Sequence, residues 1–161
     1  MGKTSVDTRS AERQLHEFLA KFTPEIAAQA AVILGKMRKL YPSALELVYD
    51  NYNALAIGFA PSERTSEAIF SIAVYPRWVS LFFLQAKGLV DREKLLQGTG
   101  SVAKHIVLKT PDLLDDPAVL DLMRQALATA KVPFAGVGKH RLIIKSVSAK
   151  QRPRRPVRAA K

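Results

Sequence analysis

The stretch between Glu67 and Leu108 constrains the fold of this chain more than any other part of the sequence. Apolar residues recur at every second position in two adjacent runs, which is the spacing of half-buried β-strands. The pattern predicts strands at Glu67–Tyr75 and Trp78–Gln85, a short helix at Asp91–Gln97, a Gly98–Gly100 turn and a strand at Lys104–Leu108. One apolar face per strand indicates an antiparallel sheet that helices cover on one side.

Helical spacing dominates the two ends of the body. Apolar stripes predict a first helix over Ser10–Phe22 with Ser10 as its N-cap, and a second from Thr23-Pro24 to about Leu40. Acids followed by proline at Asp115-Asp116-Pro117 predict the start of a last helix. The sequence therefore predicts an α+β fold: a single antiparallel sheet with N-terminal and C-terminal helices packed on one face.

Three shorter runs complete the predicted elements. Ala54–Ala60 is apolar and short, as in a strand, and Arg141–Val147 predicts a final short strand. Leu45–Tyr49 is compatible with either helix or strand, because a short apolar run does not separate the two.

Composition excludes several kinds of chemistry. The chain has no cysteine, which rules out disulfides, thiolate nucleophiles and zinc–thiolate sites. The first residues lack the apolar core of a secretory signal, and no apolar run approaches the ~18 residues of a membrane-spanning helix. We therefore expect a cytoplasmic protein without membrane association.

Positive charge is concentrated at the C-terminus. Of the 25 Lys and Arg residues, nine lie in residues 139–161, which contain no acid, whereas the other 16 are nearly balanced by all 14 acids. We expect one domain over residues 1–147 and a basic, disordered tail over residues 148–161. The residues predicted to bind nucleic acid or another polyanion are Lys150, Arg152, Arg154, Arg155, Arg158 and Lys161. A purely solubilising tail is the alternative, and removal of residues 149–161 should leave folding intact.

The glycine turn is the main candidate for a small-ligand site. Its candidate residues are Gly98, Thr99, Gly100, Ser101, Lys104 and His105. A phosphate-binding loop needs a strand before it and a helix after it, whereas this turn is predicted to follow a helix and precede a strand. A helix C-cap glycine followed by a turn is therefore the favoured interpretation.

Metal and aromatic candidates are weaker. Asp112, Asp115 and Asp116 are the metal candidates among the acids, although capping of the last helix accounts for Asp115 or Asp116. The histidines lack the spacing of metal ligands. Aromatic residues such as Trp78 and Tyr75 are not interleaved with basic ones, and Arg77 only flanks one strand, so we expect packing rather than base stacking.

Several segments together resemble one known family. They are Tyr75-Pro-Arg-Trp78-Val-Ser-Leu-Phe-Phe-Leu84, Gly88-Leu-Val-Asp91, Leu95-Leu-Gln-Gly98-Thr-Gly100, Ile106-Val-Leu108, the helix around Val119–Ala126 and the tail from Lys145 to Arg155. Over residues 40–130 the chain resembles the YdhG-like family of bacterial domains of unknown function, which includes frataxin-like proteins. The resemblance implies an α+β fold similar to frataxin. The family tends to have Asp-Pro where this chain has Asp91-Arg92, and often a lysine where it has Ser101.

The resemblance also implies a possible iron function. Frataxin-like proteins bind iron through an acidic ridge on the first helix and the neighbouring strand. Here Glu12 and Glu17 are offset by Arg13 and Lys21, so iron is implied by analogy of fold alone, and no other cofactor is expected. The sequence contains no catalytic motif. It favours a non-enzymatic binding or adaptor module whose tail contacts a polyanion, with an iron chaperone and an enzyme with a site at the glycine turn as alternatives.

Overall fold

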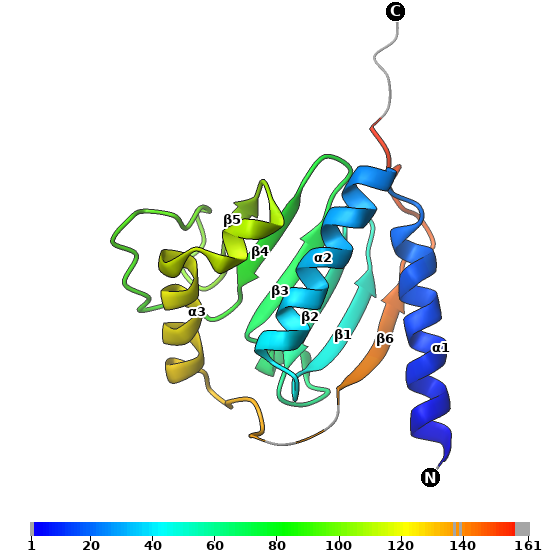
Figure 1. Cartoon of the computed structure of the whole chain (residues 1–161), viewed down its shortest axis with the longest axis horizontal. Coiled ribbons are helices and arrows are strands. Elements are labelled where there is room, and N and C mark those ends of the chain that lie inside the picture. The colour runs from blue at the N-terminus through cyan, green and yellow to red at the C-terminus, as the bar shows by residue number, and fades with distance from the viewer. Residues whose placement is uncertain (1, 137, 139, 157–161) are drawn as a thin grey trace, which may run out of the picture.

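A six-stranded sheet with helices on one face forms the body of the protein (Figure 1). The computed structural model describes residues 2–136, 138 and 140–156. The strands are β1 (Leu45–Asp50), β2 (Leu55–Ala60), β3 (Phe70–Val74), β4 (Val79–Phe83), β5 (Lys104–Leu108) and β6 (Arg141–Val147). The helices are α1 (Gly2–Leu19), α2 (Pro24–Leu40) and α3 (Pro117–Thr129), with short 3-10 helices η1 (Thr65–Glu67) and η2 (Pro111–Asp115). The α+β class is therefore confirmed.

The sheet is mixed, so the prediction of a purely antiparallel sheet is wrong in one respect. The strand order is β5-β4-β3-β2-β1-β6, and each neighbouring pair from β1 to β5 is antiparallel. β6 pairs with β1 in parallel. Because β6 follows α3, the chain crosses the molecule and adds β6 to the far edge beside β1 (Figure 1). Strand direction after such a long connection is not encoded in local alternation.

Capping residues fix the starts of two helices as predicted. The Thr23 side chain accepts a hydrogen bond from the backbone N–H of Ile26, and Pro24 occupies the first turn of α2. Asp116 caps α3 by accepting from the N–H of Ala118 at 2.8 Å. The first helix differs, because α1 already begins at Gly2 and Ser10 lies inside it.

The predicted helix over Asp91–Gln97 does not form. The Asp91 carboxylate instead accepts hydrogen bonds from the backbone N–H groups of Leu95 and Leu96, at 2.9 and 2.8 Å. These bonds give the backbone an alternative to helical pairing, which is the usual reason that aspartate favours turns. Lys94 has a φ of 54°, a left-handed conformation that breaks a helix. Leu45–Tyr49, which the sequence left open, lies in strand β1.

Alternate positions along the strands build the two faces of the sheet. One set, including Val48, Ile57, Ile72 and Leu81, joins the helices in a single buried core. The opposite face is covered at one side by the segment around Ala68, which packs with Leu47 and Ala60. The rest of that face has no helix over it (Figure 1). In the described part of the chain, no helix has the length and apolar character needed to cross a membrane.

Candidate functional site

The glycine turn does not follow a helix, so its interpretation as a helix C-cap is wrong. Gly98 has a φ of 114° and follows Gln97, which forms an isolated antiparallel bridge with His105. The two residues exchange backbone hydrogen bonds of 2.7 and 2.9 Å. The positive φ favours glycine at position 98 because other side chains are strained there. The conformation of the turn therefore accounts for glycine at position 98, and three pockets in the described part of the chain are lined by other residues.

The remaining turn candidates divide between a loop and the start of a strand, and the bridge between Gln97 and His105 brings these two parts together. Thr99, Gly100 and Ser101 are exposed in the loop, whereas Lys104 and His105 start strand β5. The His105 ring stacks on Phe82 with ring centroids 4.9 Å apart. That contact gives His105 a packing role on the face of the sheet that carries no helices.

The predicted acidic candidates do not converge on a metal site. The Asp115 carboxylate pairs with Lys36 at 2.6 Å, Asp116 caps α3, and Asp112 is an exposed residue of η2. Among the residues that the structure describes, no three His, Asp or Glu side chains are grouped so that they could hold a metal ion.

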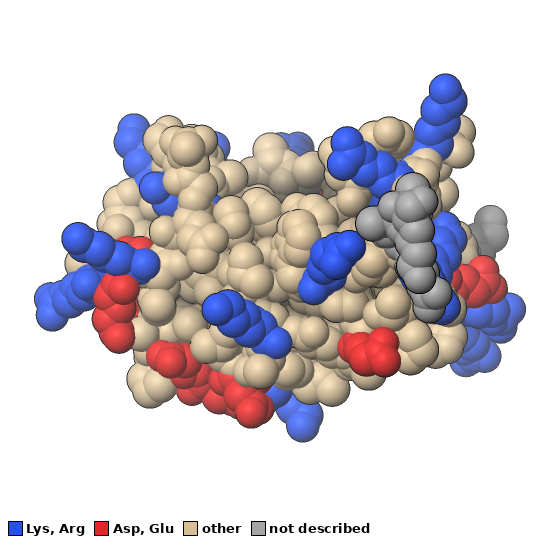
Figure 2. Space-filling model, turned by 90° about the horizontal axis from the view of Figure 1, so that it is seen from above, with Lys and Arg blue, Asp and Glu red and all other residues tan. Residues whose placement is uncertain are grey.

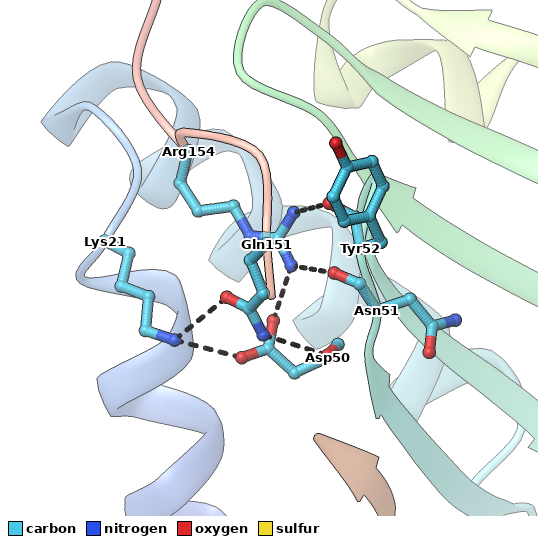
Figure 3. Close-up of polar contacts among 6 residues, drawn as sticks. All are labelled: Lys21, Asp50, Asn51, Tyr52, Gln151 and Arg154. Atoms are coloured by element: carbon cyan, nitrogen blue, oxygen red, sulfur yellow. Dashed lines mark hydrogen bonds and ion pairs between the residues drawn. The ribbon is translucent and has the colours of Figure 1, made fainter. Parts of the chain in front are cut away.

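The C-terminal tail packs against the body as far as it is described. Residues 148–156 form no helix or strand, as the prolines and charges predict, but Arg154 is only 5% exposed. Its guanidinium donates to the Asp50 carboxylate at 2.8 Å and to the backbone carbonyls of Asn51 and Tyr52 (Figure 3). Arg154 therefore belongs to the interior and is not available to an external polyanion. Arg158 and Lys161, also predicted to bind one, lie outside the described residues.

Asp50 is the centre of a cluster that we call the tail anchor: Lys21, Asp50, Gln151 and Arg154 (Figure 3). The Lys21 ammonium donates to the other Asp50 oxygen at 3.0 Å and to the Gln151 side chain at 3.3 Å, and Gln151 donates to the Asp50 carbonyl. Burial alone would raise the pKa of Asp50, but hydrogen bonds from the Gln151, Arg154 and Lys21 side chains outweigh it and lower that pKa. The carboxylate is therefore charged at neutral pH and attracts both cations.

The anchored tail forms one wall of a surface groove of about 620 Å³, which we call the tail groove. Its lining residues are Asn53, Tyr75, Pro76, Arg77, Trp78, Arg152, Pro153, Arg155 and Pro156. The β1–β2 turn supplies the first of these, the β3–β4 turn the next four, and the tail the rest. Segments about 75 residues apart in the sequence thus share one concave surface, within the ~300–1,000 Å³ range of ligand pockets.

Aromatic and cationic side chains meet in the tail groove. The rings of Tyr75 and Trp78 stack with centroids 4.8 Å apart, and Trp78 is 42% exposed. Arg77, Arg152 and Arg155 are exposed. Arg152 also lies over the ring of Tyr52 at 5.6 Å. Trp78 thus packs against Tyr75, as expected, and also presents a large part of its surface to solvent in the groove that three arginines line.

The three arginines of the groove retain their charge for an external partner. Within the described part of the chain, no salt bridge joins Arg77, Arg152 or Arg155 to an acidic side chain. Arg155 donates instead to the backbone carbonyls of Lys21 and Ala20, which holds its side chain without neutralising it. Figure 2 views the end of the molecule from which the C-terminus leaves, where Lys and Arg are separated by uncharged surface and acids lie mainly along the lower side.

Asp50 of the tail anchor and Asn53 of the tail groove were not identified from the sequence. Asp50 ends a strand that also contains Glu46, and two acids four positions apart in an apolar strand lie on the same face. Buried acids require partner cations, so this spacing was a signal that Arg or Lys from elsewhere must reach the strand. Asn53 carries no comparable signal, because its role depends only on where the tail runs.

Comparison with known proteins finds no family model, no curated protein and no solved structure that matches this chain. The function must therefore be inferred from the geometry of the chain itself.

Proposed function

We propose that the protein is a non-enzymatic binding module for nucleic acid, and that the tail groove is its binding surface. One observation carries this proposal: the stacked rings of Tyr75 and Trp78 line the same groove as Arg77 of the body and Arg152 and Arg155 of the tail, and Trp78 and the three arginines are exposed. Guanidinium groups neutralise phosphates, and aromatic rings stack on bases without regard to sequence. The same two elements occur together in surfaces that bind single strands.

Unlike a free basic peptide, the tail presents its arginines from a backbone that is held against the body. Arg154 fixes the backbone between Arg152 and Arg155, and these two arginines line the groove. Holding the cations in place reduces the entropy that is lost when phosphate binds. Lys150 is exposed just before this segment and adds to the positive field. The binding unit is therefore the folded end of the body together with residues 150–156.

Removing one groove arginine from the body and one from the tail should weaken binding in the same way. We expect Arg77→Met and Arg152→Met each to reduce affinity for labelled single-stranded DNA, and each to make the log–log salt slope shallower by about 0.7. The measurement is fluorescence anisotropy across a salt series. Trp78 is the only tryptophan, so quenching of its emission reports binding at the groove.

Lys87→Met is the matched control, since it removes one exposed positive charge at the opposite end of β4 from Trp78. It should leave the salt slope unchanged. Equal slopes for wild type, Arg77→Met and Arg152→Met would rule out the tail groove as the phosphate-binding surface. Binding without any change in Trp78 emission would count against stacking in the groove.

A further inference from the structure

A second hollow, of about 540 Å³, lies on the face of the sheet that carries no helices, and we call it the sheet hollow. It shares Asn53 and Tyr75 with the tail groove. The two surfaces are therefore neighbours that one extended ligand can occupy together. The charges lie in the tail groove, and no Lys, Arg, Asp or Glu is among the residues that line the sheet hollow.

The hollow exists because small side chains occupy the middle of the sheet. Ala56 of β2 pairs directly with Ala73 of β3, and Ser71 lies two residues before Ala73 on the same face. Larger side chains stand beside this floor, namely Phe82, opposite Ser71 on β4, and Tyr75. The result is a floor of small side chains beside aromatic rings, which leaves space for a planar ring.

Hydrogen-bonding groups border the same hollow. Asn51 and Asn53, in the turn after β1, and Ser148, at the start of the tail, are among its lining residues. A side-chain amide offers two donors and one acceptor, and a hydroxyl offers both functions. Nucleobase edges present donors and acceptors of the same kind, so these residues complement a base more closely than they complement a purely hydrocarbon group.

We infer that the sheet hollow receives an unpaired nucleobase from the strand whose phosphates bind in the tail groove. This inference rests on the proposed function and specifies its ligand class as single-stranded nucleic acid. A base in a duplex is paired and stacked, so it cannot enter the hollow without being unpaired. A single strand presents its bases freely, and it gains stacking at Phe82 or Tyr75 in addition to phosphate contacts.

The test separates base binding from phosphate binding with two probes of equal charge. The probes are labelled oligothymidine of about twelve nucleotides and an abasic strand of the same length. Ala56→Leu places a larger side chain on the floor of the hollow and leaves every charge in place. We expect it to weaken oligothymidine binding by about tenfold and to leave abasic binding unchanged. Duplex DNA should bind wild type more weakly than oligothymidine does.

Two further variants keep the result interpretable. Val107→Leu enlarges a side chain of β5 outside the hollow and should bind both probes as wild type does. Ser71→Val replaces Ala56→Leu if thermal unfolding shows that the latter does not fold. Equal binding of the two probes by wild type, or undiminished oligothymidine binding by a folded Ala56→Leu, would overturn the base site while leaving the phosphate groove standing. Failure of both probes to bind would overturn the proposed function itself.

Discussion

Replacing Arg154 with methionine is expected to lower the free energy of unfolding by about 3 kcal/mol. The Arg154 side chain is 3% exposed and the Asp50 side chain 0% exposed, so the pair is shielded from water. Methionine fills much of the same volume but leaves the buried carboxylate without its main guanidinium partner. Removing one member of a buried pair typically costs 3–5 kcal/mol. Lys21 still contacts Asp50, which places the expected loss at the lower end.

Urea denaturation of Arg154→Met and of Arg152→Met provides the comparison. Both variants remove one positive charge from the same segment, but Arg152 is exposed and should change the unfolding free energy by less than about 1 kcal/mol. The double variant Asp50→Asn with Arg154→Met should lose less stability than the sum of the single variants, because the two side chains interact directly. Additive losses would show that Asp50 and Arg154 do not stabilise the protein through their contact with each other.

The contact between Arg154 and Asp50 also affects how a truncation of residues 149–161 is interpreted. The sequence predicts that removal of residues 149–161 leaves folding intact, because the tail has no periodic pattern. That deletion also removes Gln151 and Arg154 from Asp50, so the structure leads us to expect a destabilised body. Loss of nucleic-acid binding after truncation would therefore combine lost charge with lost folding. Point substitutions at Arg152 and Arg155 separate these two effects.

Local signals in the sequence were sufficient where the deciding contact is itself local. Thr23-Pro24 and Asp116-Pro117 open helices through hydrogen bonds that span two or three residues. Alternation in the two central runs located β3 and β4, although both strands are shorter than predicted. These elements could be predicted because their hydrogen bonds and apolar faces depend on neighbouring residues.

Prediction failed where a side chain's partner lies elsewhere or where two local patterns compete. The Asp91 carboxylate bonds to the backbone of Leu95 and Leu96, and this turn replaced the helix that the apolar spacing favoured. The parallel pairing of β6 depends on a crossover after α3. Arg154 and Asp50 are separated by 104 residues, so the charge of the tail identified a basic segment without revealing that one arginine is structural.

A second buried acid lies at the other end of β1 and supports the next prediction. Glu46 has a side chain that is 0% exposed, and Arg38 of α2 holds both of its oxygens at 2.7 and 2.8 Å. His140, just before β6, contacts the same carboxylate, and Arg38 also pairs with Glu12 of α1 at 2.9 Å. This network connects α1, α2, β1 and the residue before β6, so it closes the end of the sheet opposite the tail anchor.

Arg38→Met should therefore lower the unfolding free energy by about 3–5 kcal/mol at neutral pH. Arg124→Met is the matched control, because Arg124 pairs with Asp121 on the exposed surface of α3 and should contribute at most about 1 kcal/mol. Chemical denaturation of both variants at pH 7 measures the difference. Similar losses of unfolding free energy in the two variants would mean that burial of Glu46 does not make its ion pair with Arg38 more stabilising than an exposed pair.

The pH dependence of that loss tests whether the charge of a carboxylate partner of Arg38, above all the buried Glu46, is its origin. Burial alone would raise the pKa of Glu46, but the interactions with His140 and Arg38 outweigh it, and the pKa is lowered in the folded protein. A lowered folded pKa adds stability that is present above the unfolded value of about 4.3 and disappears as pH falls through the folded value. The gap between wild type and Arg38→Met should therefore narrow below about pH 4. A gap that stays constant between neutral pH and pH 3 would assign the loss to the packing of the Arg38 side chain and not to its charge.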